Sequence, residues 1–302
     1  MLKRLKSLNT HLMRTGLICA SLVVAAAALL PVYNAPAAPA GVQAAQTANT
    51  AFAAHKALYQ IRLASAKSGA QVINISGDMF YEWQPSCDGW TSNNRFNLLY
   101  EYADAPTTQI TSDFSTYETF DGKSLSFTSQ SKQDGQVLDE LRGSASIDAE
   151  GKGEAVYSKP RGLAFDLPAG TLFPMAHTVE MLKKIKEGKK FFNAVIFDGS
   201  DEDGPIEVNA FIGQPVPPES VLNPTPAINA DLLKSPAHKV RLAFFPLNNP
   251  ASIADYEMSM VVHENGLVSD MTIEYHDFSV TQKLVALEPV PSTCEPLKTY
   301  NK

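Results

Sequence analysis

The chain contains 302 residues, and its 25 lysines and arginines against 32 aspartates and glutamates give a net charge of −7. Hydrophobic residues make up 44% of the chain, which is enough for a large core. Disorder throughout and a disulfide-rich miniature fold are therefore excluded. The acidic balance also argues against a nucleic-acid partner, because such proteins normally carry a basic domain.

The first 40 residues have the organisation of a secretory signal peptide. A basic segment precedes an apolar run over residues 17–30 and a stretch of small residues over 35–40. Its basic residues are Lys3, Arg4, Lys6 and Arg14. We expect cleavage after Ala40, because the apolar run is shorter than the ~20 residues that a membrane anchor needs. Lipidation of Cys19 is rejected because a bulky residue, Ile18, precedes it.

Removal of residues 1–40 changes the charge and the cysteine count of the mature chain. Four basic residues leave, so 21 remain against 32 acidic ones, a net charge of −11. Two cysteines remain, Cys87 and Cys294, and in an oxidising exported compartment they most simply pair as a disulfide. A catalytic thiol is the alternative, but no neighbouring base is evident. We expect residues 41–53 to form a flexible leader and residues 54–298 a single domain.

Alternating apolar and polar residues dominate the mature chain and predict β-strands. The pattern covers residues 96–102, 206–212 and 240–244. Two further alternating segments flank Asn265-Gly266, the dipeptide most typical of a tight β-hairpin. Asp134-Gly135 indicates a second hairpin. Half-polar strands at short spacing favour a mainly β fold with an antiparallel sheet that curls or closes.

One segment has a helical period instead. Pro174 is typical of a helix start, and we expect an amphipathic helix from there to about Gly188, packed against the curved sheet. Its apolar stripe comprises Met175, Val179, Leu182 and Ile185. Residues 213–226 contain five prolines and are expected to form a surface loop within one sheet, with a linker between two domains as the alternative.

Lysines gather on the polar side of this helix and just after it. They are Lys183, Lys184, Lys186, Lys189 and Lys190. One hypothesis is a patch for an anionic partner, such as lipid headgroups or an acidic wall polymer. The simpler interpretation, which we favour, is a solvated helix face whose last lysines complement the negative end of the helix dipole.

Sequence motifs for catalysis or metal binding are not evident. The chain has no Gly-x-Ser-x-Gly elbow, and the segment that begins at His263 lacks the second histidine of a zinc-protease motif. The five histidines after residue 40 have no ligand spacing, so we expect neither a metal nor a cofactor. The acidic segment 198–204 has Asp203 where a calcium loop needs glycine, and we expect a solvated turn there.

A series of short motifs resembles a known family. They are His55-Lys56-Ala57-Leu58-Tyr59, Tyr81-Glu82-Trp83, Cys87-Asp88-Gly89-Trp90, Leu167-Pro168-Ala169-Gly170-Thr171-Leu172-Phe173-Pro174 followed by His177-Thr178, and Phe197-Asp198-Gly199-Ser200, with Cys294 near the end. In this order, over roughly residues 50–298, they resemble the cell-envelope integrity protein EipB family of Gram-negative α-proteobacteria, long catalogued as a domain of unknown function.

The resemblance implies a periplasmic protein whose strands wind into a β-spiral or near-barrel around a central helix, with the two cysteines joined. It also implies a role in envelope maintenance and stress resistance, without an established enzymatic activity. The architecture is similar to that of periplasmic lipoprotein carriers of the LolA and LolB type, a likeness of fold that does not define a ligand. His55, Trp90, His177 and Asp198 lie in the motifs, but the resemblance assigns them no role.

Three functions remain open from the sequence. The leading hypothesis is a protein that is not an enzyme and maintains the envelope by binding a periplasmic protein or a wall component. The alternative is a carrier or binder of lipid or lipoprotein, which needs an apolar cavity within the curved sheet. The third is a hydrolase, which needs a nucleophile and a base that meet in a cleft.

Overall fold

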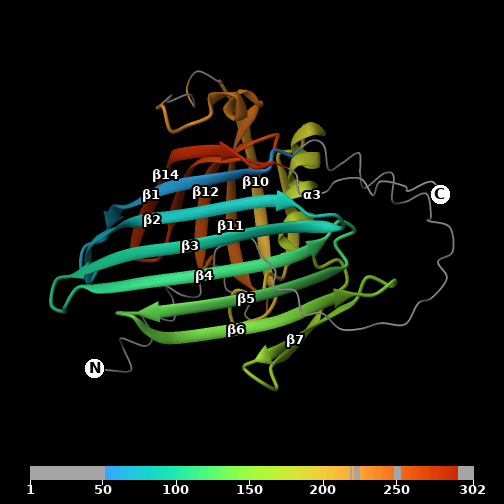
Figure 1. The fold of residues 1–302 in the computed structure, drawn as a ribbon, viewed down its shortest axis with the longest axis horizontal. Coiled ribbons are helices and arrows are strands. Elements are labelled where there is room, and N and C mark those ends of the chain that lie inside the picture. The colour runs from blue at the N-terminus through green and yellow to red at the C-terminus, as the bar shows by residue number, and fades with distance from the viewer. Residues whose placement is uncertain (1–51, 218–219, 221–224, 248–252, 292–302) are drawn as a thin grey trace, which may run out of the picture.

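A computed structural model describes residues 52–217, 220, 225–247 and 253–291. Within these residues, fourteen strands form one antiparallel sheet (Figure 1). The strands are β1 (His55–Ala66), β2 (Val72–Pro85), β3 (Gly89–Tyr102), β4 (Thr108–Thr119), β5 (Ser124–Gln133), β6 (Gln136–Ile147), β7 (Gly153–Lys159), β8 (Ala164–Leu167), β9 (Phe191–Ile196), β10 (Ile206–Val216), β11 (Ala237–Pro246), β12 (Tyr256–His263), β13 (Val268–Glu274) and β14 (Phe278–Pro289). The signal peptide, most of the leader and Cys294 lie outside the described residues.

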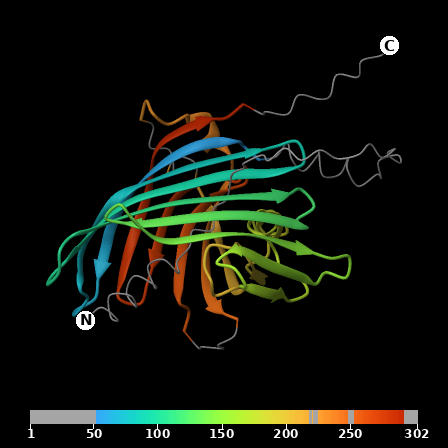
Figure 2. The same cartoon turned by 60° about the horizontal axis from the view of Figure 1, so that its bottom comes forward.

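The strand order explains how a simple meander becomes a spiral. The order is β8-β7-β6-β5-β4-β3-β2-β1-β14-β13-β12-β11-β10-β9, so the first strand lies in the middle of the sheet beside the last one. The chain runs outward to the edge strand β8, crosses to the opposite edge at β9 and returns to β14. The sheet curves strongly but stays open, because β8 and β9 do not pair with each other (Figure 2).

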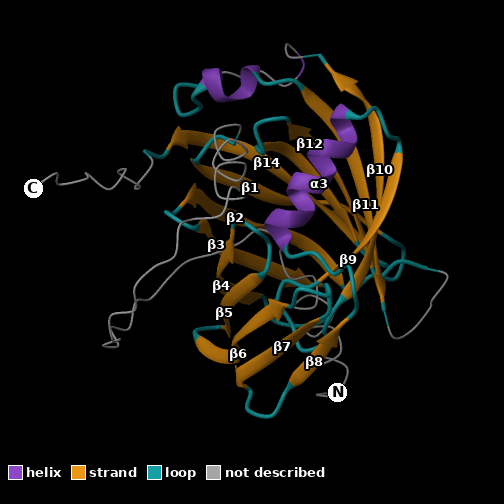
Figure 3. Cartoon of the chain, turned by 90° about the vertical axis from the view of Figure 1, so that its right-hand side faces the viewer, coloured by secondary structure: helices purple, strands orange, loops and turns teal. Residues whose placement is uncertain are grey.

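The crossing segment contains the helix α3 (Pro174–Lys186), which lies on the concave side of the sheet (Figure 3). Leu172, just before the helix, forms an isolated parallel bridge with Ile196 of β9. The chain between the two edge strands is therefore itself attached to the edge of the sheet. The mainly β fold around one amphipathic helix, expected from the sequence, is confirmed in this open form.

The helix begins at Pro174 as expected, but its buried face differs from the predicted stripe. Val179 is 37% exposed, whereas His177 and Met181 are 2% and 5% exposed. Met181 and Ile185 follow the buried His177 by four and eight residues, and Leu182 precedes Ile185 by three, so these side chains share the buried side of the helix. Val179 lies about 200° around the helix from His177. The prediction that Val179 is buried is wrong, because apolar character alone does not establish which side of a helix faces the core.

Both predicted hairpins are confirmed. Asn265-Gly266 lies in the turn between β12 and β13, and the buried side chains alternate on both strands. Asp134-Gly135 joins β5 to β6 with Gln133 and Gln136 paired on either side. In this second hairpin, the φ angles of Asp134 and Gly135 are positive, at 50° and 81°, as a type I′ turn requires.

The proline-rich segment is less irregular than expected. Residues 213–216 continue strand β10 and are not loop, with a register irregularity between Ile212 and Pro215. Strands β10 and β11, before and after this segment, pair directly. The segment therefore does not separate two sheets.

The buried side chains form three clusters. The largest joins the strands from β9 through β14 to β3 and includes Met181, Leu182 and Ile185 of the helix. A second one packs β4–β8 against Phe173 and Phe197. The third contains Trp83, Trp90 and Met175. No helix in the described part of the chain combines the length and hydropathy of a membrane-spanning segment.

Candidate functional site

The N-terminus of α3 is held by a carboxylate from a distant strand. Glu118 of β4 accepts hydrogen bonds from the backbone N–H groups of Met175, at 2.7 Å, and Ala176, at 2.8 Å. The residue at the N-cap position, Phe173, offers no side-chain oxygen to these groups. A helix start needs such acceptors, and Glu118 supplies them across 57 residues of sequence.

Burial gives Glu118 an unusual acidity. Its side chain is only 2% exposed, and this burial raises the pKa of the carboxyl from 4.5 to about 8. The two N–H donors act in the opposite direction, because they favour the ionised form. Gain or loss of a proton on the Glu118 carboxyl therefore changes the strength of its hydrogen bonds to the first turn of the helix.

Two tryptophans complete this attachment. Trp83 and Trp90 stack with ring centroids 5.1 Å apart, and the indole N–H of Trp83 donates to the sulfur of Met175 at 3.2 Å. Phe52 and Phe120 contact the pair edge-on. Trp90 and Glu118 are direct partners on neighbouring strands. We call the set of Trp83, Trp90, Glu118 and Met175 the helix anchor.

Two motif histidines lie in buried positions. His55 of β1 has its ring 5.9 Å from that of Trp83, and its Nδ1 lies 2.6 Å from the carbonyl oxygen of Ala53. His177 of α3 packs against Phe192, with centroids 5.6 Å apart. Burial lowers both pKa values, that of His177 to about 4, so both rings are neutral at pH 7. Neither Nε2 has a hydrogen-bond partner within the described residues.

The acidic turn between β9 and β10 is only partly solvated, which corrects the sequence prediction. Asp198 is half-buried, and burial raises the pKa of its carboxyl. Gly199 follows with a φ of +74°, directly against the ring of Phe127. The Tyr157 hydroxyl donates to the carbonyl of Asp201 at 2.6 Å. The first half of the turn therefore belongs to the core, because a glycine allows it to approach the aromatic cluster.

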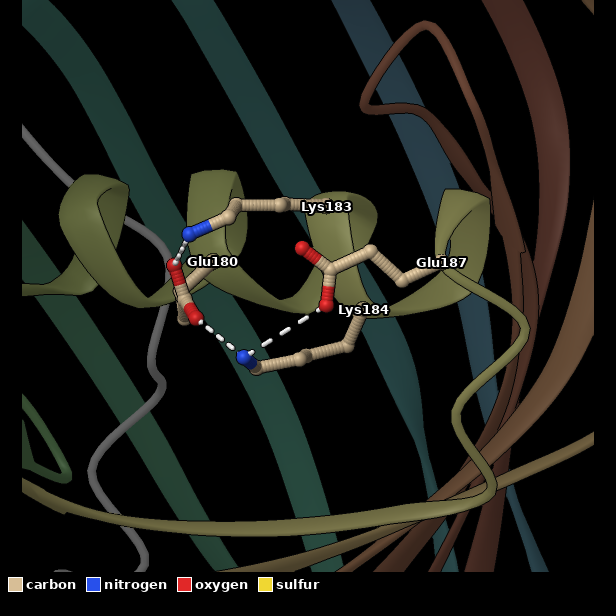
Figure 4. A network of polar contacts seen from close by, with 4 residues as sticks. All are labelled: Glu180, Lys183, Lys184 and Glu187. Carbon is tan, nitrogen blue, oxygen red and sulfur yellow. Dashed lines mark hydrogen bonds and ion pairs between the residues drawn. The ribbon is translucent and has the colours of Figure 1, made fainter.

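The lysine patch is partly neutralised by two glutamates, one on the helix and one at its C-cap (Figure 4). Glu180 pairs with Lys183 at 3.4 Å and Lys184 at 2.9 Å, and Glu187 lies 3.7 Å from Lys184. The other three lysines of the patch are exposed and have no such ion pair in the described part of the chain. They are Lys186, Lys189 and Lys190. An anionic partner for the patch stays a prediction.

Only one cysteine of the predicted disulfide, Cys87, lies among the described residues. Cys87 is exposed in the turn between β2 and β3. His55 pairs with Trp83 of β2 on one side and with Pro289 of β14 on the other. The ends of β2 and β14 are therefore about 10 Å apart at the usual strand spacing, within reach of the few residues that lead to each cysteine. Pairing of Cys87 with Cys294 stays a prediction.

One serine–histidine pair bears on the hydrolase hypothesis. His263 Nε2 lies 2.9 Å from Ser269 Oγ, and His263 Nδ1 lies 3.1 Å from the carbonyl oxygen of Ser235. His263 is fully buried and Ser269 is 8% exposed. The second ring nitrogen thus meets a backbone carbonyl where a catalytic triad has a carboxylate. This geometry supports a structural role, which is to tie the β12–β13 hairpin to Ser235.

Among the described residues, no three His, Cys, Asp or Glu side chains come together in a way that could hold an ion.

Comparison with known proteins relates these features to a family. The sequence model of the EipB-like family matches residues 46–291. The chain belongs to the EipB-like family. Cell envelope integrity protein EipB of Brucella abortus (strain 2308) is 29% identical over 237 residues, which cover 78% of this chain and 83% of that protein.

A solved structure agrees with this assignment to the EipB-like family. It is the crystal structure of a beta-barrel-like protein of domain of unknown function DUF1849 from Brucella abortus, with a TM-score of 0.73 and 28% identity. The match covers 80% of this chain and 99% of that one. The family expected from the motifs is therefore confirmed.

The motifs that indicated the EipB-like family converge on α3. Trp83 and Trp90 pack with Met175 at its start, and His55 lies beside Trp83. Phe173 and Phe197 lie in the second cluster, and the motif after Leu167 leads into the helix. Glu118 was missed from the sequence because no motif marks it. Its one signal is alternation, since Phe114, Thr116 and Glu118 share one buried face of β4.

Proposed function

We propose that this EipB-like protein maintains the integrity of the cell envelope from the periplasm, as a non-catalytic binding protein. The observation that carries the proposal is the extended match to cell envelope integrity protein EipB over 83% of that protein's length. The signal-peptide pattern of residues 1–40 supports a periplasmic location.

The roles of the helix-anchor residues and of the two motif histidines support binding over catalysis. Glu118 is occupied by two backbone N–H groups, and Trp83 by the sulfur of Met175. His55 and His177 are buried as neutral rings. These side chains build and fix the attachment of a helix, so they favour a rigid scaffold that offers its surface to a periplasmic protein or a wall component.

The lipid-carrier hypothesis makes a different demand on the same fold. It needs an apolar cavity on the concave side, where Met181, Leu182 and Ile185 of α3 are buried among sheet residues. Among the residues that the structure describes, no specific contact favours a bound acyl chain over this packed helix. We therefore treat bound lipid as an outcome of the test below.

The proposal is tested by affinity capture from periplasmic extract with the tagged mature chain. Protein, glycan and lipid in the eluate are identified separately, and each candidate partner is tagged in turn for capture in the reverse direction. We expect one envelope protein or wall fragment to be captured in both directions. Stoichiometric phospholipid without such a partner would contradict the proposal and support a carrier.

A further inference from the structure

Two phenylalanines form an exposed pair at the edge of the sheet. Phe191 of β9 and Phe211 of β10 are direct partners across the two strands, with ring centroids 5.1 Å apart. They are 50% and 53% exposed, while their neighbours Phe192, Ala210 and Ile212 are buried. The pair therefore lies on the convex face of the sheet, opposite the core.

Four exposed lysines lie in the segments that adjoin this pair. Lys189 and Lys190 directly precede Phe191, and Lys186 ends the helix just before them. Across the strands, Lys239 lies beside Gly213, two residues after Phe211, and is exposed. These four lysines have no ion pair within the described residues, in contrast to Arg241, which pairs with Glu257 and Glu274.

We propose that Phe191 and Phe211, with Lys186, Lys189, Lys190 and Lys239, form a contact site for an anionic phospholipid surface. The two rings would enter the interfacial region while the flexible lysines contact headgroup phosphates. We call these six residues the Phe–Lys face. The inference rests on the proposed periplasmic location, where the outer leaflet of the inner membrane is accessible.

Charge complementarity favours a lipid surface as the occupant. The mature chain carries a net charge of −11, so a local group of four free lysines sets one orientation toward a negatively charged plane. Addition of a peptide strand to the edge of β9 is less favoured, because Leu172 already bridges this strand at Ile196. An exposed aromatic pair with exposed lysines in the adjoining segments is a combination that interfacial proteins use.

The test is cosedimentation of the mature chain with vesicles. One set contains phosphatidylcholine with about one quarter phosphatidylglycerol, and the other contains phosphatidylcholine alone. We expect binding to the anionic vesicles, at least about tenfold weaker binding to the neutral ones, and loss of binding as salt rises to about 0.5 M. Absence of binding to anionic vesicles at low salt would overturn the proposal.

Variants locate the effect on the Phe–Lys face. We expect Phe191→Ser with Phe211→Ser, and separately Lys186→Gln with Lys189→Gln and Lys190→Gln, to weaken binding at least about tenfold. The matched control is Val137→Ser with Leu138→Ser, an exposed apolar pair on β6 that should leave binding unchanged. Unaltered melting temperatures show that each variant is folded.

Two results contradict the inference at this stage. One is wild-type affinity of the double phenylalanine variant, and the other is equal weakening by the β6 control. Lys→Arg replacements at the same three positions should retain binding, since the charge is kept. Vesicle binding is measured without any cellular phenotype, so failure here leaves the proposed envelope role to its own test.

Discussion

Glu118 shows how one residue couples the sheet to the helix. A carboxyl group that is 2% exposed would be costly to bury alone, but both of its oxygens accept backbone N–H groups of α3. Its pKa of about 8 means that the folded protein holds a proton which the unfolded chain releases above its ordinary pKa of 4.5. The stability of the fold is therefore linked to pH at this residue.

The pH dependence of unfolding tests this link. The stabilising contribution is complete below pH 4.5 and is lost as the pH rises to about 8, at about 1.4 kcal/mol per pH unit. Buried His177, with a pKa lowered to about 4, acts only below pH 6.5. Between pH 6.5 and 8, urea unfolding should therefore show wild-type stability falling relative to Glu118→Gln. Parallel curves for the two proteins would contradict the linkage.

A second residue-scale prediction concerns Gly199. An alanine Cβ there would lie 2.4 Å from a ring carbon of Phe127, at a φ of +74°. We expect Gly199→Ala to cost about 2–4 kcal/mol, from backbone strain and steric overlap together. Gly170→Ala is the matched control, because its φ is +86° and no atom lies within 4 Å, so only about 1–2 kcal/mol of strain applies. Equal losses in chemical denaturation would contradict the packing explanation.

The sequence predicts the environment of a residue where that environment is set by its near neighbours in the chain. Asp134, Gly135 and Gly266 were identifiable because a hairpin turn requires positive φ within a few residues. Glu118 was not, because its partners lie 57 and 58 residues away. Asp198 was expected in solvent, since nothing in its own segment indicates that the next residue, Gly199, packs against the ring of Phe127.

At the scale of elements, α3 is positioned by its ends and by one face. The helix anchor fixes its first turn, and Met181, Leu182 and Ile185 pack it against the sheet. Its start and its length were predictable, because Pro174 is a local signal for a helix start and Gly188 one for a helix end. The choice of buried face was not fully predictable, because the burial of His177 depends on Phe192 of a later strand.

Paired truncations on the helix test this assignment of faces. We expect Leu182→Ala to destabilise the protein by about 2–5 kcal/mol, because it leaves a cavity in the largest cluster. Val179→Ala should change stability by no more than about 0.5 kcal/mol, since Val179 is on the exposed side. Thermal or urea unfolding measures both, and a larger loss for Val179→Ala would contradict the observed orientation.

At the scale of the whole molecule, the pairing of β1 with β14 makes one sheet out of two meanders. Alternation in the sequence predicts the strands and which face of each is buried. It cannot predict that the first and last strands are neighbours, since any two edge strands can satisfy the same pattern. The same pairing brings the end of β14 near the turn that contains Cys87, so the predicted disulfide would fasten the junction of the two meanders.

Reduction of the protein purified under oxidising conditions tests this fastening. A disulfide between Cys87 and Cys294 would close a loop around most of the domain and stabilise the fold by up to about 5 kcal/mol. We expect dithiothreitol to lower the melting temperature of the wild-type protein and to have no effect on Cys87→Ser. An unchanged melting temperature on reduction of the wild-type protein would show that no stabilising disulfide is present.

The proposed role in the envelope, exerted from the periplasm, is tested by growth of a deletion strain on detergent. The minimal inhibitory concentration of deoxycholate is measured for the deletion strain carrying the full chain, the chain without residues 1–40, or an empty vector. We predict that only the full chain restores wild-type resistance. Normal resistance of the deletion strain, or rescue by the chain without residues 1–40, would contradict the account.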